Sequence, residues 1–140
     1  MHSHRSQSKR RMAGIVAAIL GLATSSLAYA GFRTFHLVQI DLISQSASGS
    51  IGDARNSADF FQYIGCSLSA RNTSSHIRTS CGARNAAGVD ILCDTDEDSF
   101  APTVAAINDH SYIAFSWRST NLGNVCTKVL ISSESTTNPK

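Results

Sequence analysis

The four cysteines are the residues of this chain with the clearest chemistry. They are Cys66, Cys81, Cys93 and Cys126. Their spacings include no C-x-x-C pair and no histidine pair lies nearby, so zinc ligation is disfavoured. An even number of cysteines favours two disulfides instead. Of the three possible pairings we prefer Cys81–Cys93 with Cys66–Cys126, because Cys81 and Cys93 flank an Asn-Ala-Ala-Gly turn and could face each other across a hairpin.

A second set of candidates is basic. The tripeptide Ala-Arg-Asn occurs three times, each copy at a predicted loop or strand end. If these loops share one edge of the molecule, their arginines form an anion-binding patch. The candidate residues are Arg55, Arg71, Arg78 and Arg84, with His76 beside them. The alternative is that asparagine favours turns and that arginine covers strand ends.

Acidic residues cluster in the second half of the chain. The cluster consists of Asp90, Asp94, Asp96, Glu97 and Asp98. Its D-x-D-x-D spacing resembles the start of a calcium loop, but Ser99 and Ala105 occupy the places of the required glycine and glutamate. We therefore interpret the run as a solvated loop whose charges favour a helix N-terminus. No metal or other cofactor is predicted.

The sequence contains no established catalytic pattern such as G-x-S-x-G or H-E-x-x-H. Asp109, His110 and Ser111 are the residue types of a catalytic triad, but neighbours on a strand point to opposite faces and form no relay. The leading prediction is therefore a non-enzymatic binding or structural domain. Two alternatives stay open: a small hydrolase using His110 or His36 with Asp109, and an inhibitor of a secreted enzyme acting through the turn at 71–75.

Alternating apolar and polar residues position these candidates mostly on strands. Six strands are predicted, at Phe35–Ile43, Phe60–Ala70, His76–Ala83, Val89–Cys93, Ser111–Arg118 and Val125–Ser132. Ser44–Ser57 is expected to be a loop, and one short helix is expected to begin after Ser99. Trp117 is expected in the core, and Tyr63 on the surface. The predicted fold is mainly β, a small antiparallel sheet or sandwich of about six strands with one short helix and two disulfides.

The first thirty residues have the three parts of a secretory signal peptide. A basic stretch at 9–11 precedes an uncharged apolar run at 12–23, and Ala28-Tyr29-Ala30 is a small-x-small cleavage site. Cleavage after Ala30 leaves residues 31–140 as a single β-rich domain, with a mobile tail at 133–140. The apolar run is too short for a membrane span, so no stable anchor is expected after processing. The predicted location is secreted or periplasmic.

The charge balance changes once the leader is set aside. The whole chain has 12 basic and 10 acidic residues, and the leader contains four of the basic and none of the acidic ones. The remainder thus carries eight basic and ten acidic residues, a net charge of −2. Nucleic-acid binding requires a basic surplus, so it is not predicted. The expected partner is an envelope component, a glycan or another protein.

Two segments resemble blocks in a group of small secreted, cysteine-containing bacterial proteins without assigned function. They are Gly52–Cys66 and the Ser-Tyr-Ile-x-Phe-x-Trp strand at Ser111–Trp117. The resemblance covers most of the chain after the leader. It implies a secreted, disulfide-linked domain with a helix after the third cysteine, and it supplies no catalytic residues.

Overall fold

The computed structural model describes residues 34–72 and 75–134, which all belong to one compact unit of the chain. The strands are β1 (Gln39–Asp41), β2 (Ser46–Ser50), β3 (Tyr63–Ala70), β4 (Ile77–Arg84), β5 (Asp90–Thr95), β6 (Tyr112–Thr120) and β7 (Gly123–Ser132). The helices are α2 (Ile51–Arg55) and α3 (Ala101–Ala105), and a 3-10 turn, η1 (Asp98–Phe100), precedes α3. The predicted mainly β fold is confirmed, with seven strands and two short helices. The predicted leader and most of the predicted tail lie outside the described residues.

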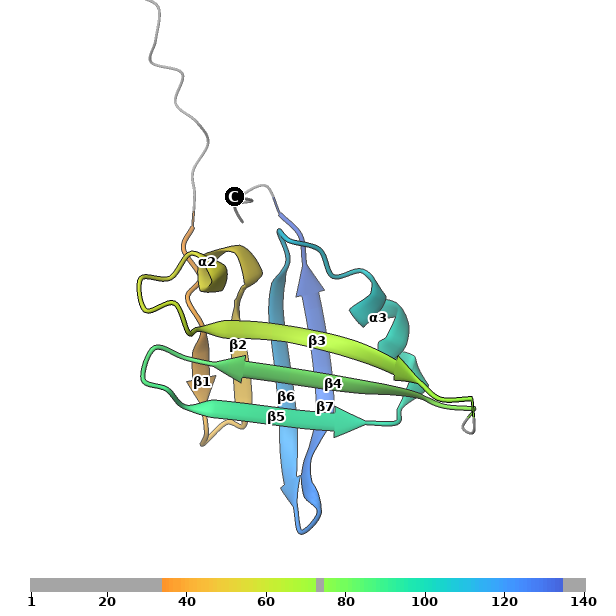
Figure 1. Ribbon diagram of the computed structural model, residues 1–140. Coiled ribbons are helices and arrows are strands. Elements are labelled where there is room, and N and C mark those ends of the chain that lie inside the picture. The colour runs from red at the N-terminus through yellow and green to blue at the C-terminus, as the bar shows by residue number, and fades with distance from the viewer. Residues whose placement is uncertain (1–33, 73–74, 135–140) are drawn as a thin grey trace, which may run out of the picture. The chain divides into compact units, whose positions relative to one another are not determined.

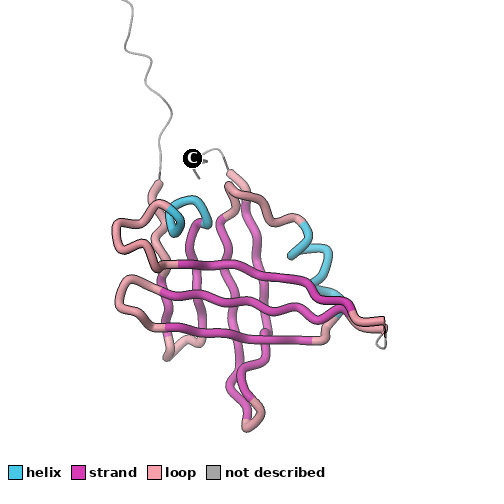
Figure 2. The backbone as a smooth tube through the Cα atoms, viewed as in Figure 1, coloured by secondary structure: helices cyan, strands magenta, loops and turns pink. Residues whose placement is uncertain are grey.

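The strands form one seven-stranded sheet that folds into two layers. Its order is β1-β2-β6-β7-β5-β4-β3, and every neighbouring pair is antiparallel except β5 with β7. Figures 1 and 2 show β3, β4 and β5 crossing the other four strands at a steep angle. The layers join at β5 and β7 through the parallel pair Asp94–Val125. The arrangement is an orthogonal packing of two parts of one sheet.

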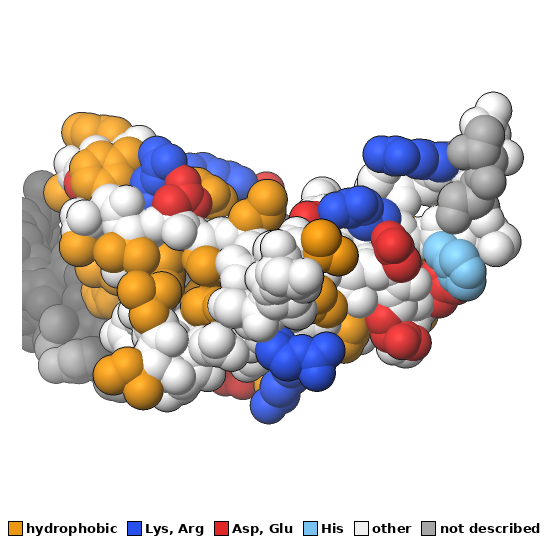
Figure 3. Space-filling view, turned by 90° about the horizontal axis from the view of Figure 1, so that it is seen from below, with side chains coloured by type: hydrophobic (Ala, Val, Ile, Leu, Met, Phe, Trp, Pro, Cys, Tyr) orange, Lys and Arg blue, Asp and Glu red, His pale blue; other side chains and the backbone are white. Residues whose placement is uncertain are grey.

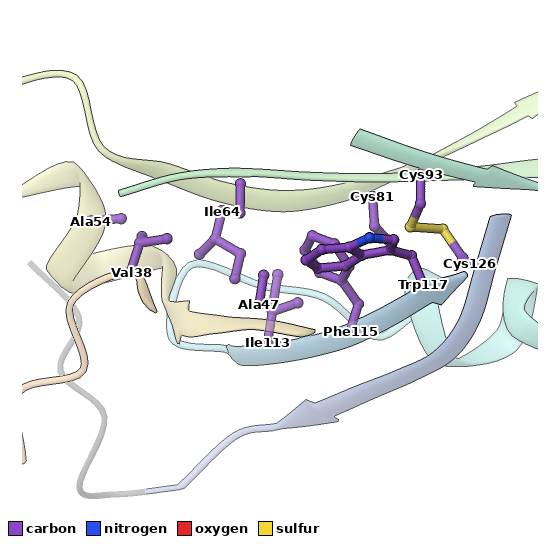
Figure 4. Packing of buried hydrophobic residues seen from close by; sticks show 11 residues of the cluster. Val38, Ala47, Ala54, Ile64, Cys81, Cys93, Ile113, Phe115, Trp117 and Cys126 are labelled. Atoms are coloured by element: carbon purple, nitrogen blue, oxygen red, sulfur yellow. A yellow bond between two sulfur atoms is a disulfide. The ribbon is translucent and has the colours of Figure 1, made fainter. Parts of the chain in front are cut away.

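The core lies between the two layers, where side chains from both point into the same space (Figure 4). Ile113, Phe115 and Trp117 occupy alternate positions of β6 and are at most 4% exposed. The centroids of the Phe115 and Trp117 rings lie 6.1 Å apart. Ile64 and Cys81 cover them from the opposite layer. The predicted inward face of β6, and the core position of Trp117, are confirmed.

Thr79 carries the one buried side-chain polar atom without a hydrogen-bond partner in the described part of the chain. Because an unpaired buried hydroxyl keeps its desolvation cost, an apolar side chain of the same shape removes that cost. We expect Thr79→Val to raise the free energy of unfolding by about 1 kcal/mol in urea denaturation. Thr95→Val, at the opposing position, is the control, because the Thr95 hydroxyl accepts a bond from the Glu97 N–H at 3.2 Å. Equal stabilisation by both variants would contradict the explanation.

The two disulfides join Cys66 to Cys81 and Cys93 to Cys126. Two disulfides are confirmed, but the predicted pairing of Cys81 with Cys93 and of Cys66 with Cys126 is wrong. Cys81 lies directly opposite both Cys66 and Cys93. A residue of an antiparallel sheet hydrogen-bonds to one neighbouring strand and brings its side chain closer to the other. The Cα atoms of Cys66 and Cys81 are only 4.0 Å apart, so β3 is on the close side, and Cys93 bonds to Cys126 at the layer junction.

The segment predicted as a loop at Ser44–Ser57 instead contains β2 and α2. β2 lacks the β-branched and aromatic residues that favour strands, and its pairing with β1 and β6 holds it in place. Ser50 caps α2, because its hydroxyl accepts a bond from the Asp53 N–H at 3.4 Å. The helix predicted to begin after Ser99 begins at Ala101, since η1 forms first.

Candidate functional site

The outward side chains of β3, β4 and β5 form rows across one face of their layer, which we call the outer face. Side chains alternate between the two faces of a strand, so the register of the strands decides which residues share a row. The rows are Tyr63–Arg84–Asp90, Gly65–Gly82–Leu92, Ser67–Ser80–Asp94 and Ser69–Arg78. The outer face therefore combines one aromatic ring, two glycines, hydroxyl groups and charged pairs.

The Tyr63 ring leans over a glycine. A Cβ atom at Gly82 would lie 3.3 Å from the Tyr63 ring and 3.4 Å from Leu92, so a side chain there would crowd both. The Tyr63 hydroxyl donates to Asp90 at 2.6 Å, and the Arg84 guanidinium lies 5.8 Å from the ring centroid. The bond to Asp90 raises the pKa of Tyr63 and lowers that of Asp90. The ring is thus held in place while 42% of the residue is exposed, as predicted.

An ion pair lies at the other end of the outer face. Arg78 Nη2 is 3.0 Å from Asp94 Oδ2, and the Ser80 hydroxyl donates to the same carboxylate. Arg78 is the main cause of the low pKa of Asp94, and Asp94 in turn raises the pKa of Arg78. Both groups therefore stay charged at neutral pH, and their charges cancel. The pair presents a donor and an acceptor side by side without net charge.

Two hollows share Leu92, one on the outer face and one at the β5 edge of that face. The larger, the hairpin groove, has a volume of about 770 Å³. It is lined by Arg78, Leu92, Asp94–Asp96 and Thr120–Val125. Asn124 Nδ2 donates to the Leu92 carbonyl oxygen at 3.0 Å and so ties the β6–β7 turn to β5. The smaller, the glycine hollow, has a volume of about 300 Å³ and lies over Gly65 and Gly82.

Charged side chains gather at the end of the β3–β4 hairpin. Figure 3, seen from the side of the β6–β7 turn, shows a hollowed outline between a broad part rich in hydrophobic side chains and an arm that carries basic, acidic and histidine side chains. His76 Nδ1 lies 3.1 Å from Asp98 Oδ2. The Ile77 N–H donates to Asp98 at 2.8 Å, and this bond is the main cause of the low pKa of Asp98. Asp98 therefore links η1 to β4.

The four candidate arginines are spread over the molecule. Arg78 and Arg84 are six residues apart on β4, or about 20 Å along a strand. Arg55 ends α2 and Arg71 follows β3. Three of the four contact aspartates, in the pairs Arg55–Asp109, Arg78–Asp94 and Arg84–Asp90. The structure does not bring the four into one site, and their anion-binding role stays a prediction.

The residues of the hydrolase alternative are not assembled in either hollow. Asp109 contacts Arg55 at 3.0 Å, and the His36 ring lies edge-on to Tyr112 at 5.1 Å between centroids. Neither His36 nor His110 lines the hairpin groove or the glycine hollow. Across residues 34–72 and 75–134, no group of three or more His, Cys, Asp or Glu side chains is placed to hold a metal ion. Within the acidic run, Asp90, Asp94 and Asp98 each contact a different basic side chain.

Sequence reasoning did not find the glycine hollow or the hairpin groove. A usable signal exists, because β3 contains Gly65-Cys-Ser67 and β4 contains the reverse, Ser80-Cys-Gly82. Each cysteine points inward, so the small residues on either side of it must lie on the same outward face. The hairpin groove has no such local signal, since it depends on where the β6–β7 turn meets β5.

Comparison of the chain with protein-family models, with curated proteins and with solved structures gives no match in any of the three. The resemblance to small secreted bacterial proteins therefore stays a prediction.

Proposed function

We propose that this protein is an exported, disulfide-stabilised, non-enzymatic domain that binds its ligand on the outer face. The observation that carries the proposal is the fixed Tyr63 ring over Gly82, with an open hollow on each side of Leu92. Binding sites combine apolar contact area with a few oriented polar groups. Tyr63 and Leu92 supply the first, and the Arg78–Asp94 pair supplies the second.

The disulfides support the exported part of the proposal. Both bonds fit an oxidising compartment, where disulfides persist. In the part of the chain that the structure describes, no helix is long and apolar enough to cross a bilayer. The predicted leader would deliver the domain to the periplasm or to the outside of the cell.

Tyr63→Ala is expected to weaken binding of the protein to the insoluble envelope fraction of its source cells about tenfold. An aromatic contact contributes up to about 1.5 kcal/mol beyond its area, which corresponds to about a tenfold change in affinity. Cosedimentation with the envelope fraction at increasing protein concentrations measures the two affinities.

Leu130→Ala is the matched control for this experiment. Leu130 is also 42% exposed, but it lies on β7 in the other layer. We expect its affinity to equal that of the unaltered protein. Two outcomes would contradict the proposal: the same loss of affinity in both variants, or no retention of the unaltered protein by the envelope fraction at any concentration.

A further inference from the structure

We infer that the ligand of the outer face is a neutral glycan chain. This inference rests on the proposed function and specifies its ligand. It follows from four properties of the outer face: the pairing of its backbone, the balance of its charges, the groups that its side chains present, and its length.

The centre of the outer face does not offer a place for an added strand. β4 pairs with β3 over eight positions and with β5 over six. β3 ends the sheet and β5 pairs with β7 at one position, so backbone that could accept another strand is confined to these two edges. The backbone donors and acceptors of paired strands are used in the ladder, so a ligand lying on this face is recognised by side chains. Peptide binding by strand addition is therefore not available on the face itself.

The charges of the outer face do not favour an anion. Arg78 lies 3.0 Å from Asp94, and Arg84 contacts Asp90, so both arginines are already neutralised. Asp96 adds a further negative charge to the lining of the hairpin groove. Phosphate-rich polymers and acidic polysaccharides bind through a surplus of positive charge, which these rows lack. Since both arginine–aspartate pairs of the face cancel, its rows suit an uncharged ligand better than an anion.

The side chains of the outer face suit a ligand that has both hydroxyl groups and apolar ring faces. Ser67 and Asn121 present hydrogen-bonding groups, and the Arg78–Asp94 pair presents a donor beside an acceptor. The exposed Tyr63 ring offers a flat apolar surface held in one orientation, which limits the entropy lost on binding. A sugar ring stacks its C–H face on such a surface while its hydroxyls reach the polar groups.

The length of the outer face favours a chain of sugars over a single one. Tyr63 and Ser69 are six residues apart on β3, which is about 20 Å in a strand. The glycine hollow is lined by residues of β3, β4 and β5, and the hairpin groove, which adjoins it at Leu92, is lined by residues of β4, β5 and the β6–β7 hairpin. A ligand that contacts Tyr63 and the Arg78–Asp94 pair together must span both hollows.

Calorimetric titration and affinity electrophoresis with purified carbohydrates test the inference. The probes are cellohexaose, chitohexaose and mannohexaose as neutral glycans, and heparin and polygalacturonate as acidic ones. We expect a neutral probe to bind at least tenfold more tightly than either acidic probe, and its disaccharide to bind at least tenfold more weakly than the hexasaccharide. Tyr63→Ala should lower the neutral affinity about tenfold, and Leu130→Ala should leave it unchanged. Tighter binding of an acidic probe would overturn the inference.

Asp94→Asn provides a second variant with a different readout. It keeps the shape of the side chain but leaves Arg78 without its carboxylate partner. We expect binding to the neutral glycan to fall and binding to heparin to rise. Unchanged binding to both would overturn the role given to the ion pair.

Failure of the inference and failure of the proposed function are distinguishable. If proteinase treatment of the envelope fraction abolishes Tyr63-dependent retention, and no purified glycan binds, the ligand is a protein: the proposed function stands and the glycan is excluded. Absence of any retention overturns both.

Discussion

Replacing Phe115 with alanine is expected to lower the free energy of unfolding by about 4 kcal/mol. Phe115 is 1% exposed and lies between the layers beside Trp117. Truncation of a buried phenylalanine loses its transfer free energy and leaves a cavity, which together cost about 3–5 kcal/mol. Domains of this size have a total stability of about 5–15 kcal/mol, so the variant loses a substantial part of it.

Guanidinium unfolding followed by tryptophan fluorescence measures this loss. Trp117 is the only tryptophan of the chain and is buried, so its emission reports on the core. Phe61→Ala is the control, because it makes the same chemical change at a residue that is 43% exposed. We expect the control to change stability by less than about 1 kcal/mol. A similar loss in both variants would show that Phe115 is not part of a tightly packed core.

Removal of the Cys93–Cys126 disulfide, by Cys93→Ala with Cys126→Ala, is expected to cost about 4 kcal/mol. The bond closes a loop of 33 residues and so restricts the unfolded chain strongly. It also crosses the layer junction, where β5 and β7 share one paired position. Without it, the junction depends mainly on that pair and on the bond from Asn124 to the Leu92 carbonyl.

The Cys66→Ala, Cys81→Ala double variant is the comparison for this prediction. This bond closes a loop of 15 residues, for which the entropic cost is about 3 kcal/mol. It also joins strands that are already paired over eight positions. Urea denaturation of both double variants should therefore show the larger loss for Cys93–Cys126, and the reverse order would contradict the role of that bond at the junction.

Strands with large inward side chains were predicted from the sequence, whereas a strand made of small residues was missed. Ile113, Phe115 and Trp117 alternate with smaller or polar residues, so the inward face of β6 was predictable from period-two spacing. β2 consists only of serine, alanine and glycine, and no such spacing marks it. It is a strand because β1 and β6 pair with it on both sides, which is a property of the assembled sheet.

The candidate site was predictable only in part, because its arrangement also depends on how the strands pair. The exposure of Tyr63 followed from its alternation with the buried Ile64. The position of its ring over Gly82 required the register of β3 against β4, which spacing within one strand does not define. Arg71 and Arg84 lie at strand ends, as predicted, whereas Arg55 ends a helix. The aspartate partners of Arg55 and Arg78 come from segments that local patterns do not connect with them.

The presence of two disulfides could be predicted from the sequence, but the pairing of the cysteines depends on the folded sheet. Their even number, and the period-two patterns around them, were sufficient to predict a mainly β domain with two disulfides. The disulfide partner of Cys81 could not be predicted in this way, because Cys81 lies opposite a cysteine on each neighbouring strand. Which of the two is close enough to bond depends on which neighbouring strand Cys81 hydrogen-bonds to. The outer face also depends on the folded sheet, because strand order and register place Tyr63, Gly82 and the Arg78–Asp94 pair on one surface. Local sequence patterns reflect the backbone period of each strand, whereas order and register result from packing the layers against each other.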